Sequence, residues 1–189
     1  METSLQKLRA ALLTALPAMA ELETYTVDPR HTLPTYEVGH LGYSMQRGRF
    51  NKTTGKITLD AEARKGSADI VMEAGSVSSG IDKLDEHLRS EDFFNAAKYP
   101  QITFKSTSFA FDGDRVKSAS GDLTINGVTR PVTFNANMFL CGPHPVTKKK
   151  QCGADLVATI KRSEFGMKYA LPALADEVTL RVPVEATKD

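Results

Sequence analysis

The sequence predicts a mainly β domain, an antiparallel sandwich or barrel, with one short helical insert. Apolar and polar residues alternate in several segments, tight-turn sequences separate these segments, and a single stretch follows a helical period instead. Alternation with a period of two places the apolar side chains on one face of a strand. Several such strands at short spacing, joined by turns, are typical of antiparallel sandwiches and barrels.

The first 20 residues have the features of a secretory signal peptide. Lys7 and Arg9 precede an apolar run at 10–20, which ends in the small-x-small sequence Ala18-Met19-Ala20. A basic region, a short apolar region and a small-residue cleavage site together predict export, and the run is shorter than the roughly 20 residues that cross a bilayer. We therefore expect cleavage near Ala20-Glu21 and a periplasmic or secreted protein. The alternative is that this segment forms an amphipathic first helix of the domain.

The remaining residues, 21–189, have the length of one domain. Residues 1–20 hold two of the 24 basic and one of the 23 acidic residues, which leaves 22 of each. A surface without excess positive charge argues against nucleic acid as a partner and against electrostatic attachment to anionic membranes. No second apolar stretch approaches spanning length, so we expect no stable membrane insertion.

The first strands of the domain are expected to be short. Strand-like apolar runs lie at 25–27, 36–38, 57–59 and 70–72. Thr54-Gly55 and Lys65-Gly66 are weak turn signals between them, because glycine tolerates the positive φ that many turns need.

The stretch from 80 to 99 predicts the helical insert. Three apolar residues fall at i, i+3 and i+7, the spacing of one helix face: Ile81, Leu84 and Leu88. Ser90, which acidic residues follow, is a candidate N-cap for a second short turn that carries Phe93 and Phe94. Beside a barrel, such an insert would be either a lid at the mouth or a plug of one end, and the sequence favours neither.

The second half of the chain predicts longer strands. One run covers 101–111, and Asn126-Gly127 predicts a hairpin because both residues tolerate the positive φ of a type I′ turn. Three alternating sets follow, each with one apolar face: Val132, Phe134, Ala136 and Met138; Ala154, Leu156, Ala158 and Ile160; and Val178, Leu180, Val182 and Val184.

The two cysteines, Cys141 and Cys152, flank a polar loop. In an exported chain a cysteine pair usually forms a disulfide, and closing a loop of this size stabilises a fold by about 3 kcal/mol in the chain-entropy model. A metal site that adds His144 is the alternative, but it offers three ligands at unusual spacing and no evident fourth. We expect the disulfide and no metal site.

No catalytic motif is present. The sequence has no nucleophile elbow, zinc-protease helix, P-loop or C-x-x-C pair. Asp85 and His87 lie close on the helical insert, but residues two apart point to different faces of a helix. We therefore predict no catalytic residues, and the rival hypothesis is a hydrolase that uses His87 with Asp85.

An ordered series of short motifs resembles the YceI-like family. The motifs run over nearly the whole mature chain: Tyr25-Thr26-Val27-Asp28-Pro29-Arg30-His31, His40-Leu41-Gly42, Arg47-Gly48-Arg49-Phe50, His87-Leu88-Arg89-Ser90, Asp92-Phe93-Phe94, Tyr99-Pro100, Ile102-Thr103-Phe104, Gly121-Asp122-Leu123-Thr124, Gly127-Val128-Thr129-Arg130-Pro131-Val132 and Arg162-Ser163-Glu164-Phe165-Gly166. The resemblance implies a single extended, lipocalin-like antiparallel β-barrel with a helical insert, in a bacterial periplasmic or secreted protein. It also implies an interior that binds a polyisoprenoid or a similar long amphiphile, without enzymatic activity. The sequence departs from the family at Thr32-Leu33-Pro34, where members usually continue directly into a strand.

The predicted ligand is an isoprenoid lipid or quinone, with no other cofactor. The residues expected to line its site are Tyr36, Val38, Phe50, Leu84, Leu88, Phe94, Ile102, Phe104, Phe165 and Tyr169, of which Phe94, Phe104 and Phe165 stand in the family motifs. Small residues such as Ala154 would leave room inside the barrel. Alternatively, side chains fill the interior, and the barrel is a protein-interaction or stress-response module. A homodimer is possible on either hypothesis.

Overall fold

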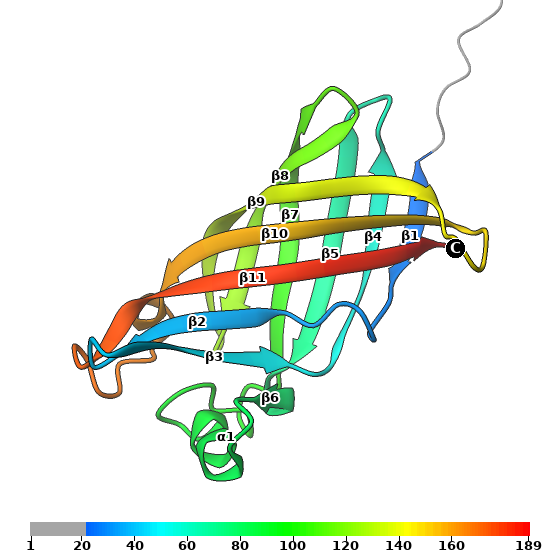
Figure 1. The fold of residues 1–189 in the computed structure, drawn as a ribbon. Helices are drawn as coiled ribbons and strands as arrows, with labels where there is room; N and C mark the ends of the chain where they lie inside the picture. Colours follow the sequence, from blue (N-terminus) through cyan, green and yellow to red (C-terminus); the bar gives the residue numbers. More distant parts are fainter. Residues whose placement is uncertain (1–21) are drawn as a thin grey trace, which may run out of the picture.

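The computed structural model describes residues 22–189, so the predicted signal peptide and its cleavage site lie outside the described residues. Eight antiparallel strands close into a barrel, in the order β1-β4-β5-β7-β8-β9-β10-β11, with β11 paired back to β1 (Figure 1). Their bounds are β1 Glu23–Val27, β4 Thr53–Asp60, β5 Lys65–Glu73, β7 Gln101–Asp112, β8 Arg115–Ile125, β9 Val128–Pro143, β10 Lys150–Lys161 and β11 Leu174–Lys188. The prediction of a mainly β fold with a closed antiparallel barrel is confirmed.

Three further strands extend the sheet beyond the barrel: β2 Thr35–His40, β3 Ser44–Phe50 and β6 Val77–Ser78. The long β11 pairs with β1 near its C-terminal end and with β2 along its first half. The loop that divides β1 from β2 contains Thr32, whose buried hydroxyl donates to the Glu185 carbonyl (3.2 Å) and accepts from the Glu185 amide (3.1 Å). The Thr32 side chain thus binds the Glu185 backbone in place of a neighbouring strand, at the point where the sequence departs from the family.

One end of the barrel carries the helical insert, and we call it the helix end. Helix α1 covers Asp82–Arg89, between the short 3-10 helix η1 (Ala74–Ser76) and β7, and a second 3-10 helix, η2 (Arg162–Phe165), follows β10. The opposite end holds the chain's C-terminus and the loop between β9 and β10, and we call it the disulfide end (Figure 1).

The insert is shorter than predicted. Ile81 is the N-cap residue and is exposed, so the apolar face of α1 consists of Leu84 and Leu88 only. Ser90 ends α1, its hydroxyl accepts a hydrogen bond from the Asp92 amide at 3.3 Å, and turns follow over 91–94. The prediction that Ser90 caps a second short turn carrying Phe93 and Phe94 is therefore confirmed.

One of the three predicted turns is a tight hairpin turn, and two are not. Asn126 and Gly127 both have positive φ (52° and 72°) and join β8 to β9, which confirms the type I′ hairpin. The Thr54-Gly55 turn is wrong, because Gly55 lies within β4, where a Cβ would stand 2.5 Å from the Asp69 carbonyl. Lys65-Gly66 already belongs to β5, and the turn before it spans 61–64. In a sequence, a glycine whose missing side chain leaves room for a neighbouring strand cannot be distinguished from a turn glycine.

Strand β9 contains an irregularity that the alternation did not reveal. Asp155 pairs with Met138, whereas the next residue, Leu156, pairs with Ala136, so Asn137 is an extra residue in β9. The bulge reverses the alternation, which turns Met138 outward and Phe139 toward the interior. The prediction that Met138 shares one apolar face with Phe134 and Ala136 is therefore wrong.

Beyond the pair Asn135–Val157, the first half of β9 and the last residues of β10 separate. Pro131 lacks the N–H that a pairing strand needs, which suits an unpaired edge. A hollow of about 420 Å³ lies between these strands on the outside, and the fully buried Phe165 of η2 lines its floor. The hydrogen-bonded ladder between β9 and β10 therefore has a gap here, beside which Phe165 packs in the apolar core.

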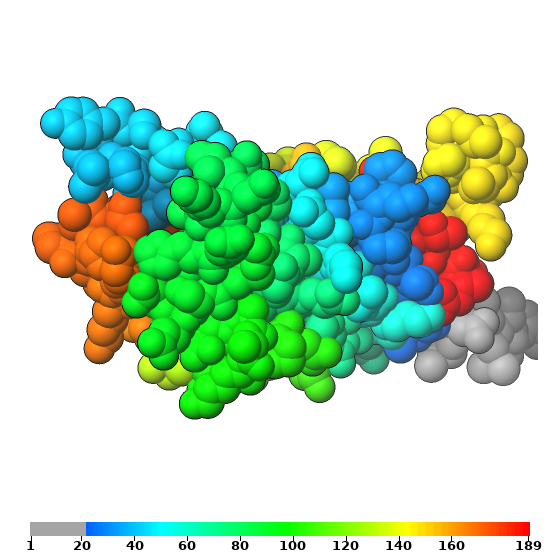
Figure 2. All heavy atoms as spheres, turned by 90° about the horizontal axis from the view of Figure 1, so that it is seen from below, coloured from blue at the N-terminus to red at the C-terminus, as the bar shows by residue number. Residues whose placement is uncertain are grey.

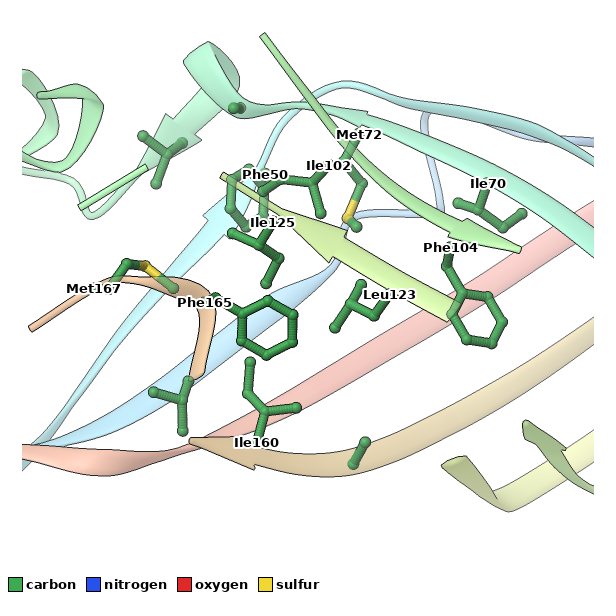
Figure 3. Packing of buried hydrophobic residues seen from close by; sticks show 14 of the residues in the cluster. Phe50, Ile70, Met72, Ile102, Phe104, Leu123, Ile125, Ile160, Phe165 and Met167 are labelled. Carbon is green, nitrogen blue, oxygen red and sulfur yellow. The ribbon is translucent and has the colours of Figure 1, made fainter. Parts of the chain in front are cut away.

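The core fills the barrel interior with apolar side chains from strands on all sides (Figure 3). Phe104 of β7 and Phe134 of β9 meet edge to face, with ring centroids 5.2 Å apart. A smaller cluster around Tyr25, Leu59 and Val116 packs toward the disulfide end.

Candidate functional site

A cavity of about 180 Å³ lies inside the barrel. All eight barrel strands contribute to its walls, and its surface is apolar. It extends from Tyr25 and Cys152 near the disulfide end to Leu88 and Phe94 at the helix end. The volume is close to the roughly 150 Å³ of an apolar cavity that holds one benzene and below the roughly 300–1,000 Å³ of typical ligand pockets.

Three aromatic rings close the cavity at the helix end. Phe50 and Phe94 meet edge to face at 5.2 Å, and Tyr36 lies 6.3 Å from each. The Tyr36 hydroxyl lies over Gly48, where any Cβ would collide with it. Burial, with a smaller effect of the Asp85 carboxylate, raises the pKa of Tyr36 to about 12, so this phenol is neutral at physiological pH.

A second aromatic group lies next to the first. The His87 ring packs edge-on against Phe93 (5.0 Å) and Tyr169 (4.9 Å), and its Nε2 lies 2.8 Å from the Asp92 carboxylate. Asp85 instead accepts hydrogen bonds from the Ser79 amide and hydroxyl, both at 2.6 Å. Burial alone would raise the pKa of Asp85, but these hydrogen bonds outweigh it and the pKa is lowered. The pair required by the hydrolase hypothesis therefore has two separate structural roles.

Arg162 organises the loop that follows η2. Its buried guanidinium donates to the carbonyl oxygens of Ala175 (2.9 Å), Met167 (3.0 Å), Tyr169 (3.0 Å) and Leu174 (3.1 Å). Burial lowers the pKa of this arginine. Its alkyl part lines the cavity, a position the sequence analysis did not assign although Arg162 begins one of the family motifs.

Seven of the ten predicted site residues line the cavity: Tyr36, Val38, Phe50, Leu88, Phe94, Ile102 and Phe104. Leu84 is half-buried and packs against the core, Phe165 is fully buried within the core cluster, and Tyr169 is 47 % exposed in the second aromatic group. None of these three lines the cavity. That the lining side chains bind lipid stays a prediction.

Much of the cavity wall comes from residues that the sequence analysis did not choose. Strand β11 contributes its complete apolar face: Val178, Leu180, Val182, Val184 and Ala186. The strict alternation of this strand was the available signal, but alternation does not say which face of a strand is inside.

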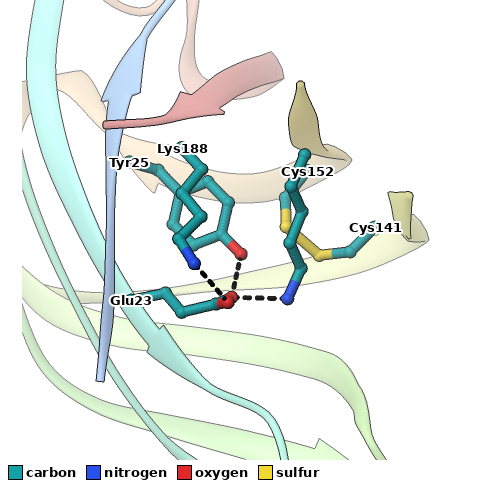
Figure 4. The surroundings of a disulfide bond; sticks show 6 residues. Glu23, Tyr25, Cys141, Cys152 and Lys188 are labelled. Atoms are coloured by element: carbon teal, nitrogen blue, oxygen red, sulfur yellow. Dashed lines mark hydrogen bonds and ion pairs between the residues drawn. A yellow bond between two sulfur atoms is a disulfide. The ribbon is translucent and has the colours of Figure 1, made fainter. Parts of the chain in front are cut away.

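The disulfide end is closed by a covalent bond and by charged contacts (Figure 4). Cys141 and Cys152 stand opposite each other on β9 and β10 and form the predicted disulfide. The Glu23 carboxylate accepts from Lys150 (2.5 Å), Tyr25 (2.5 Å) and Lys188 (2.9 Å). Mainly through Lys150, and then Tyr25, these contacts lower the pKa of Glu23 to about 2.

Two further features are absent from residues 22–189. No three His, Cys, Asp or Glu side chains gather there as a metal site. In the same part of the chain, no helix is long and apolar enough to cross a membrane.

Comparisons with known proteins agree on one family. A model of the YceI-like domain matches residues 25–186. The YceI protein of Escherichia coli O6:H1 is 36 % identical over 191 residues, which cover 100 % of this chain and 99 % of that protein. Among solved structures, Burkholderia cenocepacia BcnA superposes with a TM-score of 0.73 at 27 % identity, over 85 % of this chain and 99 % of BcnA. A polyisoprenoid-binding domain from Saccharophagus degradans superposes with a TM-score of 0.63 at 15 % identity, over 89 % of this chain and all of that domain, and so shares the fold.

Proposed function

This chain belongs to the YceI-like family, and from that premise we propose that it is a non-enzymatic binding or carrier protein for a long apolar lipid. The proposed ligand class is a polyisoprenoid or an isoprenoid quinone, and the proposed location is the periplasm or the cell exterior. The ligand named for the Saccharophagus degradans domain belongs to the same class.

The apolar cavity along the barrel is the observation that carries the proposal. An apolar chain needs no charged contact, because burial contributes about 0.8 kcal/mol per methylene. About 20 methylenes would contribute roughly 16 kcal/mol, and ordering of the flexible chain offsets part of this gain. Such a site leaves no polar motif in the sequence.

The cavity size adds a requirement to the proposal. A volume of about 180 Å³ holds only part of a long chain, so binding must displace side chains that now occupy the interior. Leu88 and Phe94 are the natural ones, because they belong to the insert rather than to the barrel ladder and close the cavity at the helix end. On this proposal the insert acts as a lid.

Native mass spectrometry of protein purified from the periplasm without detergent tests the proposal, followed by organic extraction of bound molecules. We expect a stoichiometric adduct that extracts as an isoprenoid or quinone. A ligand-free mass that stays unchanged after incubation with such lipids would instead favour a packed barrel that acts as an interaction module.

Variants locate the ligand within the barrel. Phe104→Asp places a charge in the cavity wall and should abolish lipid retention, whereas the exposed Lys148→Ala should retain lipid fully. Since a buried charge can unfold the chain, Ala154→Phe provides a second variant that fills the cavity with an apolar ring. Equal retention by Ala154→Phe and Lys148→Ala would contradict the assignment of the cavity as the binding site.

A further inference from the structure

Exposed apolar side chains are concentrated at the helix end. Nine large apolar side chains are exposed among residues 22–189, and five of them lie at this end: Leu41, Tyr43, Met45, Ile81 and Tyr169. We call these five residues the helix-end rim. Figure 2 shows the three segments that carry them, the β2–β3 hairpin, the loop after η2 and the insert, on the side of the molecule away from the loop between Cys141 and Cys152.

The tip of the β2–β3 hairpin carries two exposed apolar residues, Leu41 and Tyr43, that folding does not require. Tyr43 is 90 % exposed, and Leu41 is half exposed with a φ of 53°. Positive φ normally selects Gly, Asn or Asp, so an asparagine would serve this turn better than a leucine. The Leu41 amide donates to the Ala173 carbonyl (3.0 Å), which holds the tip against the loop before β11.

The rim surrounds the end of the cavity that the insert closes. The hairpin that carries Leu41 and Tyr43 also supplies Tyr36 and Val38 to the cavity wall. Tyr169 packs against Phe93, the neighbour of the cavity residue Phe94. Exposed apolar groups and the closed mouth therefore share one end of the molecule.

We propose that the helix-end rim docks on the surface of a lipid bilayer, with Leu41 and Tyr43 entering the boundary between headgroups and acyl chains. Tyrosine and aliphatic residues are the side chains that settle at this boundary. The proposal rests on the proposed function in one respect, since docking there would place the cavity mouth next to the lipid that it loads.

The shape of the rim favours a membrane over a protein partner. Its five exposed side chains come from three different segments, and Tyr43 at the hairpin tip is 90 % exposed, whereas a stable protein interface needs a complementary face of about 800 Å² on each partner. A fluid bilayer accommodates such projecting side chains without a preformed complementary face.

The charges beside the hairpin favour insertion over electrostatic attraction. Arg47 and Arg181 both pair with the Glu37 carboxylate, at 2.8 and 3.4 Å. Because Glu37 offsets one of these two positive charges, we expect docking on zwitterionic vesicles and only a small dependence on salt.

The chain contains no tryptophan, so a single introduced tryptophan reports on one position. The test compares Tyr43→Trp with Val146→Trp, whose site is 80 % exposed on the loop at the disulfide end. Both proteins are mixed with phosphatidylcholine vesicles that carry brominated acyl chains. We expect a blue shift and quenching for Tyr43→Trp only. No quenching of Tyr43→Trp, or equal quenching of both variants, would overturn the proposal.

A second substitution separates docking from folding. Leu41→Asn removes the apolar group and suits the positive φ better, so the fold should stay intact while Tyr43→Trp loses most of its quenching. Unchanged quenching in this double variant would contradict a role for Leu41.

Bound lipid, measured by native mass spectrometry on the same proteins, keeps the two proposals apart. If the chain docks but carries no lipid, quenching persists with a ligand-free mass, and only the carrier function fails. If it carries lipid but does not dock, the adduct is present without quenching, and only the docking proposal fails.

Discussion

The two ends of this barrel are closed by different kinds of contact. At the disulfide end, a covalent bond joins β9 to β10, and Glu23 links β1 to Lys150 and Lys188. At the helix end, aromatic rings from the insert pack on rings from β2 and β3 without any covalent link. Apolar contacts are non-directional, so rings can move past one another at small cost, whereas a disulfide fixes its two strands. On the proposed carrier function, we therefore expect the helix end to be the one that opens.

Arg162→Leu is expected to have the largest effect on stability, because it removes the hydrogen bonds that hold the loop after η2 at the helix end. Four carbonyl oxygens lose their donor, and each buried polar group without a partner costs about 1–3 kcal/mol. With partial hydration of the loosened loop, we expect the free energy of unfolding to fall by about 3–5 kcal/mol. Urea unfolding measures this loss, and retention of bound lipid should fall as well.

The matched control breaks the other end by a similar amount. Cys141→Ala with Cys152→Ala removes the disulfide, which contributes about 3 kcal/mol in the chain-entropy model, but leaves the aromatic contacts of the helix end in place. Cys152 lines the far end of the cavity, but alanine is smaller and apolar, so the folded double variant should retain lipid like the native protein. If it lost lipid as readily as Arg162→Leu does, the functional difference between the two ends would disappear.

Glu23→Gln tests the charged contacts of the disulfide end through pH. The folded-state pKa of Glu23 is about 2, below its ordinary value of 4.5. A lowered carboxyl pKa stabilises the fold above about pH 4.5, and this contribution is lost as pH falls toward 2. Because the two lysine side chains are 46 % and 44 % exposed, we expect only about 1 kcal/mol at pH 7.

Urea unfolding of the native protein and of Glu23→Gln, at pH 7 and near pH 2.5, checks this prediction. The stability difference should be present at pH 7 and nearly absent at the lower pH. A difference that stayed constant over this range would show that hydrogen bonding, rather than charge, connects Glu23 to its partners.

A contrast between regular and irregular strands explains which parts of the fold the sequence predicts well. Strand β10 over 154–160 and strand β11 over 178–186 keep strict alternation, and the predicted apolar faces of both strands point to the interior. In β9 the extra residue Asn137 reverses the alternation, and bulges of this kind have no clear signature in a single sequence. Local patterns therefore predict regular strands and miss the points where tertiary pairing shifts their register.

The site shows the same limit for a different reason. Aromatic motif residues such as Phe94 and Phe104 line the cavity, whereas Phe165, equally apolar, packs in the core beside it and also lines the hollow between β9 and β10. Arg162 escaped notice because a buried cation is uncommon in a core, and its four acceptors are backbone carbonyls that no side-chain pattern reveals. The apolar and aromatic side chains predict a cavity, whereas the conformation of the loops determines which of these residues line it.

Tyr169→Ala gives the smallest and most local effect, and it tests whether the helix end opens independently of the rest. Tyr169 joins the loop after η2 to the insert through edge-on contacts with His87 and Phe93, yet it is 47 % exposed. Aromatic pairs contribute about 0.5–1.5 kcal/mol when buried, so at this exposure we expect a loss of about 0.5 kcal/mol in global stability. Amide hydrogen exchange in α1 should nevertheless accelerate several-fold, because local opening depends on local contacts. The exposed Val146→Ala at the disulfide end is the control, and it should change neither quantity. Acceleration spread evenly over the barrel strands would mean that the insert opens only when the whole barrel unfolds, and the lid proposed at this end would then have no independent motion.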